Sequence, residues 1–288
     1  MAIDGAGLAS EELRRFSELN PARSFGASLA SDAHAASRFF LAGQALIDRL
    51  PERAWRSAAE QAAAEALHRD LRATRTAFLR RHAADLYDSL TDGRTRFVRV
   101  EELAYLAASE VPGLVPTRAQ IDAERTHAQK DKEGYEVDQG IFLSYVLSDP
   151  LAGGHLVHAM LRPRQESLDL LADFQVRGRL DIGNTSVERH GPVGYVLHGN
   201  PRFLNAEDDS TTSTLEIATD LVLLDPTIEV GVLRGKVVDH PRYAGRRVFN
   251  AGINLTHLYH GQISLIDFFV VRDMGYLHKM YRGLSGDE

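Results

Sequence analysis

The hydrophobic period of this 288-residue chain changes near residue 180. Before that point apolar residues recur with helical spacing, and after it short apolar runs alternate with turn residues. Such a change requires two regions that bury their apolar faces in different ways. We therefore predict an α/β protein with an all-α domain over residues 27–180 and an α/β core over residues 181–288. Residues 1–26, rich in Ala, Gly and Ser, are predicted to form a mobile or loosely docked N-terminal arm.

The helical prediction is clearest after Pro51, where one face of a long amphipathic helix is apolar. Thr117 and Gln120 have the spacing of a capping box, which predicts that another helix starts there. Further helices are predicted over residues 137–147, 151–161 and 165–176. The apolar face of the long helix carries Leu67, Leu71, Phe78, Leu79, Ala83, Leu86 and Leu90. Its solvated face is expected to carry Arg72, Arg75, Arg80 and Arg81, and phosphate binding by these arginines is the alternative interpretation.

The second region reads as a strand–helix–strand core. Residues 185–190 and 193–198 flank Gly191-Pro192 and predict a hairpin. A helix is predicted over residues 209–224, with Asp209, Ser210 or Thr211 available as its cap, and a strand over residues 228–233. A strand beginning at Val248 would complete a βαβ-type arrangement.

Residues 247–255 predict an apolar strand that turns at Gly252 and enters a helix. Glycine allows a sharp turn and a close ligand, so the N–H of Ile253 can point outward. A free N–H at a helix start can donate to a developing negative charge. The alternative interpretation is an ordinary strand-to-helix turn with no ligand.

Composition excludes several classes of function. The chain has no cysteine, which excludes disulfides, zinc–thiolate sites, iron–sulfur clusters and thiol nucleophiles. A formal net charge of −7 gives no overall attraction to nucleic acid or to an anionic membrane, so local basic groups must hold any anionic ligand. With no leader or long apolar run, we expect a cytoplasmic protein that binds neither nucleic acid nor membrane.

No metal site is predicted. His155 with His158 and His257 with His260 are spaced as helical pairs, but neither pair has a carboxylate within one turn. The single Glu-x-x-His match, at Glu124, has no second copy for a di-iron bundle. Nucleophile-elbow, Walker and Gly-x-Gly-x-x-Gly motifs are also missing from the sequence.

Arg272 follows the apolar run 266–271 and is expected to be partly buried. A buried guanidinium needs acceptors. These acceptors can come from a structural carboxylate or from a polar substrate, and the sequence leaves both alternatives open.

Two segments resemble the crotonase (enoyl-CoA hydratase/isomerase) superfamily. Residues 199–207, Gly-Asn-Pro-Arg-Phe-Leu-Asn-Ala-Glu, are similar to its Asn-Arg-Pro-x-x-x-Asn-Ala-Leu loop, and residues 249–255, Phe-Asn-Ala-Gly-Ile-Asn-Leu, to its Phe-Ser-Ala-Gly-Ala-Asp-Leu turn. The resemblance implies a crotonase-type ββα core that binds an acyl-CoA thioester and stabilises an enolate. It also implies that the N–H of Ile253 is one of two oxyanion donors, with Gly252, Asn254 and Leu255 beside the substrate.

The departures from that pattern are informative. Glu207 stands where ordinary members have an apolar residue, Asn254 stands where they have Asp, and the long helical region is unusual for them. This combination, with Arg272, resembles the dioxygenases that act on (3,5-dihydroxyphenyl)acetyl-CoA in glycopeptide-antibiotic biosynthesis. That resemblance implies no metal or organic cofactor, dioxygen as co-substrate, an arylglyoxylate and CoA as products, Glu207 and Arg272 at the ring hydroxyls, and a homotrimer or hexamer.

In that family the second oxyanion donor lies on a glycine-rich turn after a further strand. The sequence ends at Glu288, so we expect only the N-terminal half of the core here, and we do not expect this chain alone to be active. Two alternatives stay open: an enoyl-CoA hydratase or isomerase, and a non-catalytic acyl-CoA-binding or assembly protein.

Overall fold

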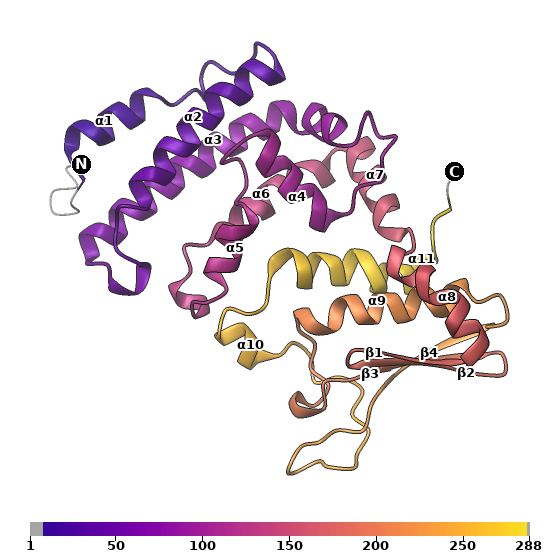
Figure 1. Cartoon of the computed structure of the whole chain (residues 1–288). Coiled ribbons are helices and arrows are strands. Elements are labelled where there is room, and N and C mark those ends of the chain that lie inside the picture. Colours follow the sequence, from indigo (N-terminus) through magenta and orange to yellow (C-terminus); the bar gives the residue numbers. More distant parts are fainter. Residues whose placement is uncertain (1–7, 287–288) are drawn as a thin grey trace. The chain divides into compact units, whose positions relative to one another are not determined.

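The computed structural model describes residues 8–286 and divides the chain into two compact units, Met1–Leu156 and Val157–Glu288 (Figure 1). The first unit is helical, and the second combines helices with a small mixed sheet. The chain is therefore α/β, as predicted. No helix in the described part is both long and apolar enough to cross a membrane.

The first unit is built around the long helix α3 (Ala58–Leu90), which packs against α2 (Leu29–Ile47) and α6 (Tyr135–Ser148). The apolar face predicted for α3 is buried, with Phe78 and Leu86 fully enclosed. The predicted capping box is confirmed, since the Thr117 hydroxyl accepts from the N–H of Gln120. The other elements are α1 (Ser10–Glu18), η1 (Arg53–Trp55), α4 (Val100–Glu110), α5 (Arg118–Glu124), η2 (Gln129–Asp131) and α7 (Pro150–Leu161), within which the division into units falls.

The predicted mobile arm, residues 1–26, lies partly outside the described residues. In the part that is described, α1 is docked on the helical unit. Phe16 is buried and stacks on Phe39 with ring centroids 4.5 Å apart. Gly43 permits this contact, since a Cβ there would lie 2.9 Å from the Phe16 ring.

The solvated face predicted for α3 is wrong at one position. Arg75 is buried, and its guanidinium donates to the carbonyls of Leu114 (2.8 Å) and Gly113 (2.9 Å). Helical spacing alone could not reveal this, because the acceptors come from a loop that is distant in sequence.

The second unit contains a four-stranded sheet in the order β1-β2-β3-β4, with α9 lying on it (Figure 1). The predicted hairpin is confirmed as β2 (Thr185–His190) and β3 (Val193–His198). Helix α9 (Asp209–Leu224) connects β3 to the parallel strand β4 (Val230–Gly235), which is two residues later than predicted. The core contains Phe174, Val187, Val196, Leu215 and Leu221.

The boundary predicted near residue 180 differs from the division at residue 156. Helix α8 (Gln165–Arg177) was assigned to the helical domain, but its Phe174 packs into the core beneath α9. β1 (Arg179–Ile182), which follows α8 directly, pairs with β2. The change of hydrophobic period therefore falls inside the second unit.

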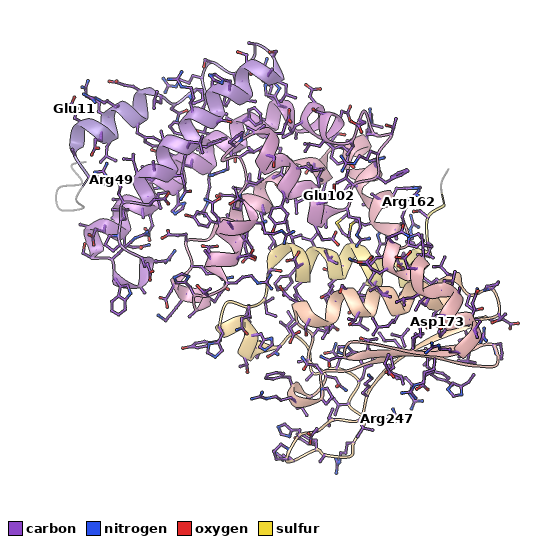
Figure 2. The ribbon with its side chains drawn as sticks, viewed as in Figure 1. Glu11, Arg49, Glu102, Arg162, Asp173 and Arg247 are labelled. Atoms are coloured by element: carbon purple, nitrogen blue, oxygen red, sulfur yellow. The ribbon has the colours of Figure 1, made fainter. Side chains whose placement is uncertain are left out.

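After β4 the chain makes a long connection to α10 (Leu255–Tyr259), and Figure 2 shows Arg247 on it. The strand predicted from Val248 does not form, and only isolated bridges occur there. Gly235 explains how this segment approaches the sheet, since a Cβ there would lie 1.7 Å from the carbonyl oxygen of Val248. Helical segments η4 (Leu265–Val270), η5 (Asp273–Leu277) and α11 (His278–Arg282) follow.

A buried ionic cluster joins this last segment to α9. The Nζ atom of Lys279 lies 2.7 Å from Glu216 and 2.8 Å from Asp220, and all three side chains are fully buried. Burial raises the pKa of Asp220, and the Lys279 ammonium offsets this effect only in part. A buried charge is costly without its partner, so the cluster fixes η5 and α11 on α9. It thereby also positions the residues of η5.

Candidate functional site

The structure brings Glu207 and Ile253 together in an isolated parallel bridge. The N–H of Glu207 donates to the carbonyl of Gly252, and the N–H of Asn254 donates to the carbonyl of Glu207, each at 2.8 Å. In a parallel bridge the flanking peptides make these bonds, so the peptide N–H of the central residue points away from the partner. Within the described residues the N–H of Ile253 accordingly has no acceptor.

Gly252 provides the turn that precedes this N–H. Its φ is +90°, a left-handed value that favours glycine, and a Cβ there would meet no atom within 4 Å. Its N–H donates to the side-chain oxygen of Asn250, which closes the turn. Because α10 has only five residues, we assign its dipole no role and treat the Ile253 N–H as a single oriented donor.

Asn254 has a structural position in this arrangement. Its side chain is buried and caps α10 by accepting from the N–H of His257 at 3.2 Å. Its amide nitrogen donates to Asp208 at 3.0 Å. Asp208 also accepts from Asn200 at 3.0 Å and lies 2.9 Å from His257. One buried carboxylate therefore ties the turn to the loop after β3.

Asp208 also caps α9, by accepting from the N–H of Ser210 at 3.1 Å. The cap was predicted one to three residues later. Sequence alone could not choose among the consecutive polar residues 208–211, because each of them can accept such a bond.

Glu207 is 5% exposed and receives three donors. Arg272 Nε lies 2.6 Å and the Tyr276 hydroxyl 2.7 Å from Oε2, while Asn250 donates to Oε1. The partial burial predicted for Arg272 is confirmed, since 30% of its side chain is exposed. Its acceptors include a second carboxylate, Asp273, at 2.9 Å.

The electrostatics of this cluster favour a charged Arg272 and a neutral Tyr276. Burial disfavours the charged guanidinium, but the hydrogen bonds to Glu207 and Asp273 and the negative charge around them together outweigh burial and raise the pKa of Arg272. Burial, followed by the negative charge of Glu207, raises the pKa of Tyr276. Tyr276 is therefore a neutral hydroxyl that donates to a carboxylate at physiological pH.

The remaining predicted residue does not converge on this cluster. Leu255 is 72% exposed, as are large parts of Phe249 and Tyr259. Two residues of the cluster were missed by the sequence analysis. Tyr276 could have been found from its spacing of four residues from Arg272 in a helical stretch, and Asn250 carried no comparable signal.

The histidine pairs are used in other ways. His257 contacts Asp208, and His155 bonds the Tyr87 hydroxyl at 2.7 Å. His158 lies 3.2 Å from the carbonyl of Gly286. Across residues 8–286, no group of three or more His, Asp or Glu side chains is arranged to hold a metal ion.

The comparison with known proteins adds an independent observation. The chain is similar to a dioxygenase. It is 50% identical over 242 residues to the (3,5-dihydroxyphenyl)acetyl-CoA 1,2-dioxygenase of Amycolatopsis orientalis, and the match covers 84% of this chain. The chain spans 56% of that relative's length. The resemblance to such a dioxygenase, predicted from Glu207, Arg272 and the long helical region, is thereby confirmed, while no protein-family model matches the chain.

Proposed function

We propose that this chain belongs to a crotonase-type dioxygenase that acts on (3,5-dihydroxyphenyl)acetyl-CoA. The observation that carries the proposal is the Glu207–Ile253 bridge, which directs the N–H of Ile253 away from Glu207 and leaves it without an acceptor among the described residues, beside a buried carboxylate–guanidinium pair. The 50% identity to a relative of that name supports the choice of substrate.

The proposed role of Ile253 is to donate its N–H to the thioester carbonyl. Removing an α-proton moves negative charge onto that oxygen, and a donor already held in place stabilises it without reorganisation. A donor of this kind is typically worth about 2.7 to 4 kcal/mol. The Gly252 turn fixes the donor's direction. A second donor is expected from a glycine-rich turn, and no described residue is assigned to it.

Glu207 and Arg272 are proposed to recognise the ring hydroxyls. Arg272 uses Nε for Glu207 and Nη1 for Asp273, so within the described residues its Nη2 remains available to a ligand. A carboxylate accepts from a phenol while a guanidinium donates to it, so the pair suits a hydroxyl that must do both. Tyr276 would hold Glu207 in place during this exchange.

The proposed reaction needs no metal or organic cofactor, because the electron-rich enolate itself reduces dioxygen. The balance closes: the arylacetyl thioester and one O2 give the arylglyoxylic acid and CoA. One oxygen atom forms the ketone and the other enters the carboxyl group as the carbon–sulfur bond breaks. Of the two α-hydrogens, one becomes the proton on the leaving thiolate and the other the proton of the arylglyoxylic acid. We further propose a homotrimer or hexamer.

Oxygen uptake by the full-length protein tests the proposal. With (3,5-dihydroxyphenyl)acetyl-CoA we expect one O2 consumed per CoA released, at a rate that a chelator does not change. Loss of turnover on metal removal would contradict the proposal. Oxygen-independent conversion of an enoyl-CoA would instead identify a hydratase or isomerase, and tight thioester binding without turnover would identify a binding protein.

A further inference from the structure

A basic cavity of about 470 Å³ lies in the helical unit, and none of its lining residues belongs to the Glu207–Ile253 site. Its walls come from η1, the first half of α3 and the segment before α6. Its charged lining residues are Arg53, Arg56, Arg69, Arg72, Glu65 and Glu133. A cavity of about 300 to 1,000 Å³ is the size that small molecules occupy in proteins.

The positive charge of this cavity is only partly compensated. Arg56 forms a two-point pair with Glu133, and Arg72 shares Asp138 with Arg75. Arg53 donates to a neutral group, the carbonyl of Lys132, at 3.1 Å.

Arg69 has no partner within the described residues, and Glu65, the other lining carboxylate, accepts from Gln61 at 2.8 Å. Two guanidinium groups are therefore left without a carboxylate, in a chain whose net charge is −7.

Two buried polar atoms in the lining also lack partners. They are Oε1 of Gln61 and Nδ1 of His68. His68 Nε2 lies 3.0 Å from Glu133, and a carboxylate accepts only, so Nε2 carries the hydrogen of that bond and Nδ1 is the ring nitrogen left for a ligand. Buried acceptors without donors are uncommon in folded proteins. A ligand for this cavity should therefore bring hydrogen-bond donors as well as negative charge.

We propose that this cavity binds a phosphate ester that carries hydroxyl groups. The phosphate would contact Arg53, Arg69 and the remaining Nη1 of Arg72, because planar guanidinium groups match phosphate oxygens. The hydroxyls would donate to Gln61 and His68. The ester is either a free sugar phosphate or the nucleotide portion of a coenzyme A derivative. The site shares no residue with the Glu207–Ile253 site, so the two proposals stand or fall separately.

Calorimetric titration of the chain tests the proposal, with ribose 5-phosphate and adenosine 3′,5′-bisphosphate as probes. Saturable binding is expected, and inorganic phosphate should bind at least about tenfold more weakly because it lacks the sugar hydroxyls that would reach Gln61 and His68. Arg53→Gln and Arg69→Gln should each weaken binding about tenfold, which corresponds to about 1.4 kcal/mol. The matched control is Arg80→Gln, an exposed arginine on the same helix α3 that does not line the cavity. Gln61→Leu should weaken ribose 5-phosphate but not inorganic phosphate.

The comparison of probes identifies the source of the ester. Tighter binding of ribose 5-phosphate indicates a free sugar phosphate, and tighter binding of the bisphosphate indicates a coenzyme A nucleotide. The proposal is overturned if neither probe saturates, if Arg80→Gln weakens binding as much as the cavity variants, or if inorganic phosphate binds as tightly as the esters.

Discussion

Replacing Glu207 by glutamine should loosen the Gly252 turn, although the two side chains have nearly the same size. Three donors converge on the Glu207 carboxylate, from Arg272, Tyr276 and Asn250. A glutamine has one oxygen and one amide nitrogen. If its oxygen accepts from Arg272 and Tyr276, its nitrogen faces the amide nitrogen of Asn250. Asn250 can relieve this contact by rotating, but its oxygen then leaves the N–H of Gly252.

The magnitude follows from the bonds lost. Hydrogen bonds to charged groups contribute about 1.5–3 kcal/mol and neutral ones about 0.5–1.5 kcal/mol, so neutralising Glu207 costs about 1 kcal/mol. One lost amide bond with an unsatisfied donor adds about 1–3 kcal/mol. Arg272 is 30% exposed and water can compensate part of this, so we expect a total of about 2–3 kcal/mol.

Hydrogen–deuterium exchange of a peptide covering residues 248–259 measures this local opening. A loss of about 2–3 kcal/mol corresponds to exchange that is faster by about 30- to 150-fold. Glu229→Gln is the matched control, since Glu229 is exposed and lies outside the cluster. If Glu207→Gln and the control exchange at the same rate, the cluster does not hold the turn and the reasoning is refuted.

Three further predictions concern the same unit. Arg272→Lys keeps the charge but loses the planar guanidinium. In calorimetry, binding of (3,5-dihydroxyphenyl)acetyl-CoA should weaken about tenfold while binding of phenylacetyl-CoA changes little. Equal losses for the two thioesters would indicate a purely structural role. In Gly252→Ala the new Cβ meets no clash, but alanine must adopt a φ of +90°, so urea unfolding should show about 1–2 kcal/mol of destabilisation. The control Gly154→Ala in α7, where the space is also open, should not destabilise the protein. Burial lowers the pKa of His198 below 6.5, so the unfolded state binds more protons and the unfolding free energy should fall as the pH drops below about 6.5. His198→Gln should reduce this slope, and an unchanged slope would exclude His198 as its source.

Elements with strong local signals were predictable from the sequence. Gly191-Pro192 between two apolar runs marked β2 and β3, helical spacing marked α9, and Thr117 with Gln120 marked the start of α5. In each case the residues that determine the element lie within a few positions of one another.

The errors share a physical cause, which is a partner distant in sequence. Val248 was expected to pair in a sheet, but its carbonyl accepts from the side chain of Asn205 at 2.8 Å. The same Asn205 nitrogen donates to the carbonyl of Lys236, so one amide replaces a strand ladder. Arg75 was expected in solvent because its acceptors belong to another segment.

The candidate site was partly predictable. The turn at Gly252 was predicted from the sequence, and the structure pairs Ile253 with Glu207 so that the N–H of Ile253 points away from Glu207. The sequence indicated that Arg272 needs an acceptor but not that Glu207 would provide it. Because Glu207 and Arg272 are separated by 65 residues, only the packing of η5 and α11 on α9 brings them together.

The most direct test of the central claim is the amide proton shift of Ile253 in ¹⁵N-isoleucine-labelled protein, assigned with Ile253→Leu. On titration with (3,5-dihydroxyphenyl)acetyl-CoA, we expect this proton to move downfield as it bonds the thioester carbonyl, and free CoA should not move it. If the Ile253 proton stays in place while the thioester saturates and shifts other isoleucine signals, its N–H is not an oxyanion donor and the account is contradicted.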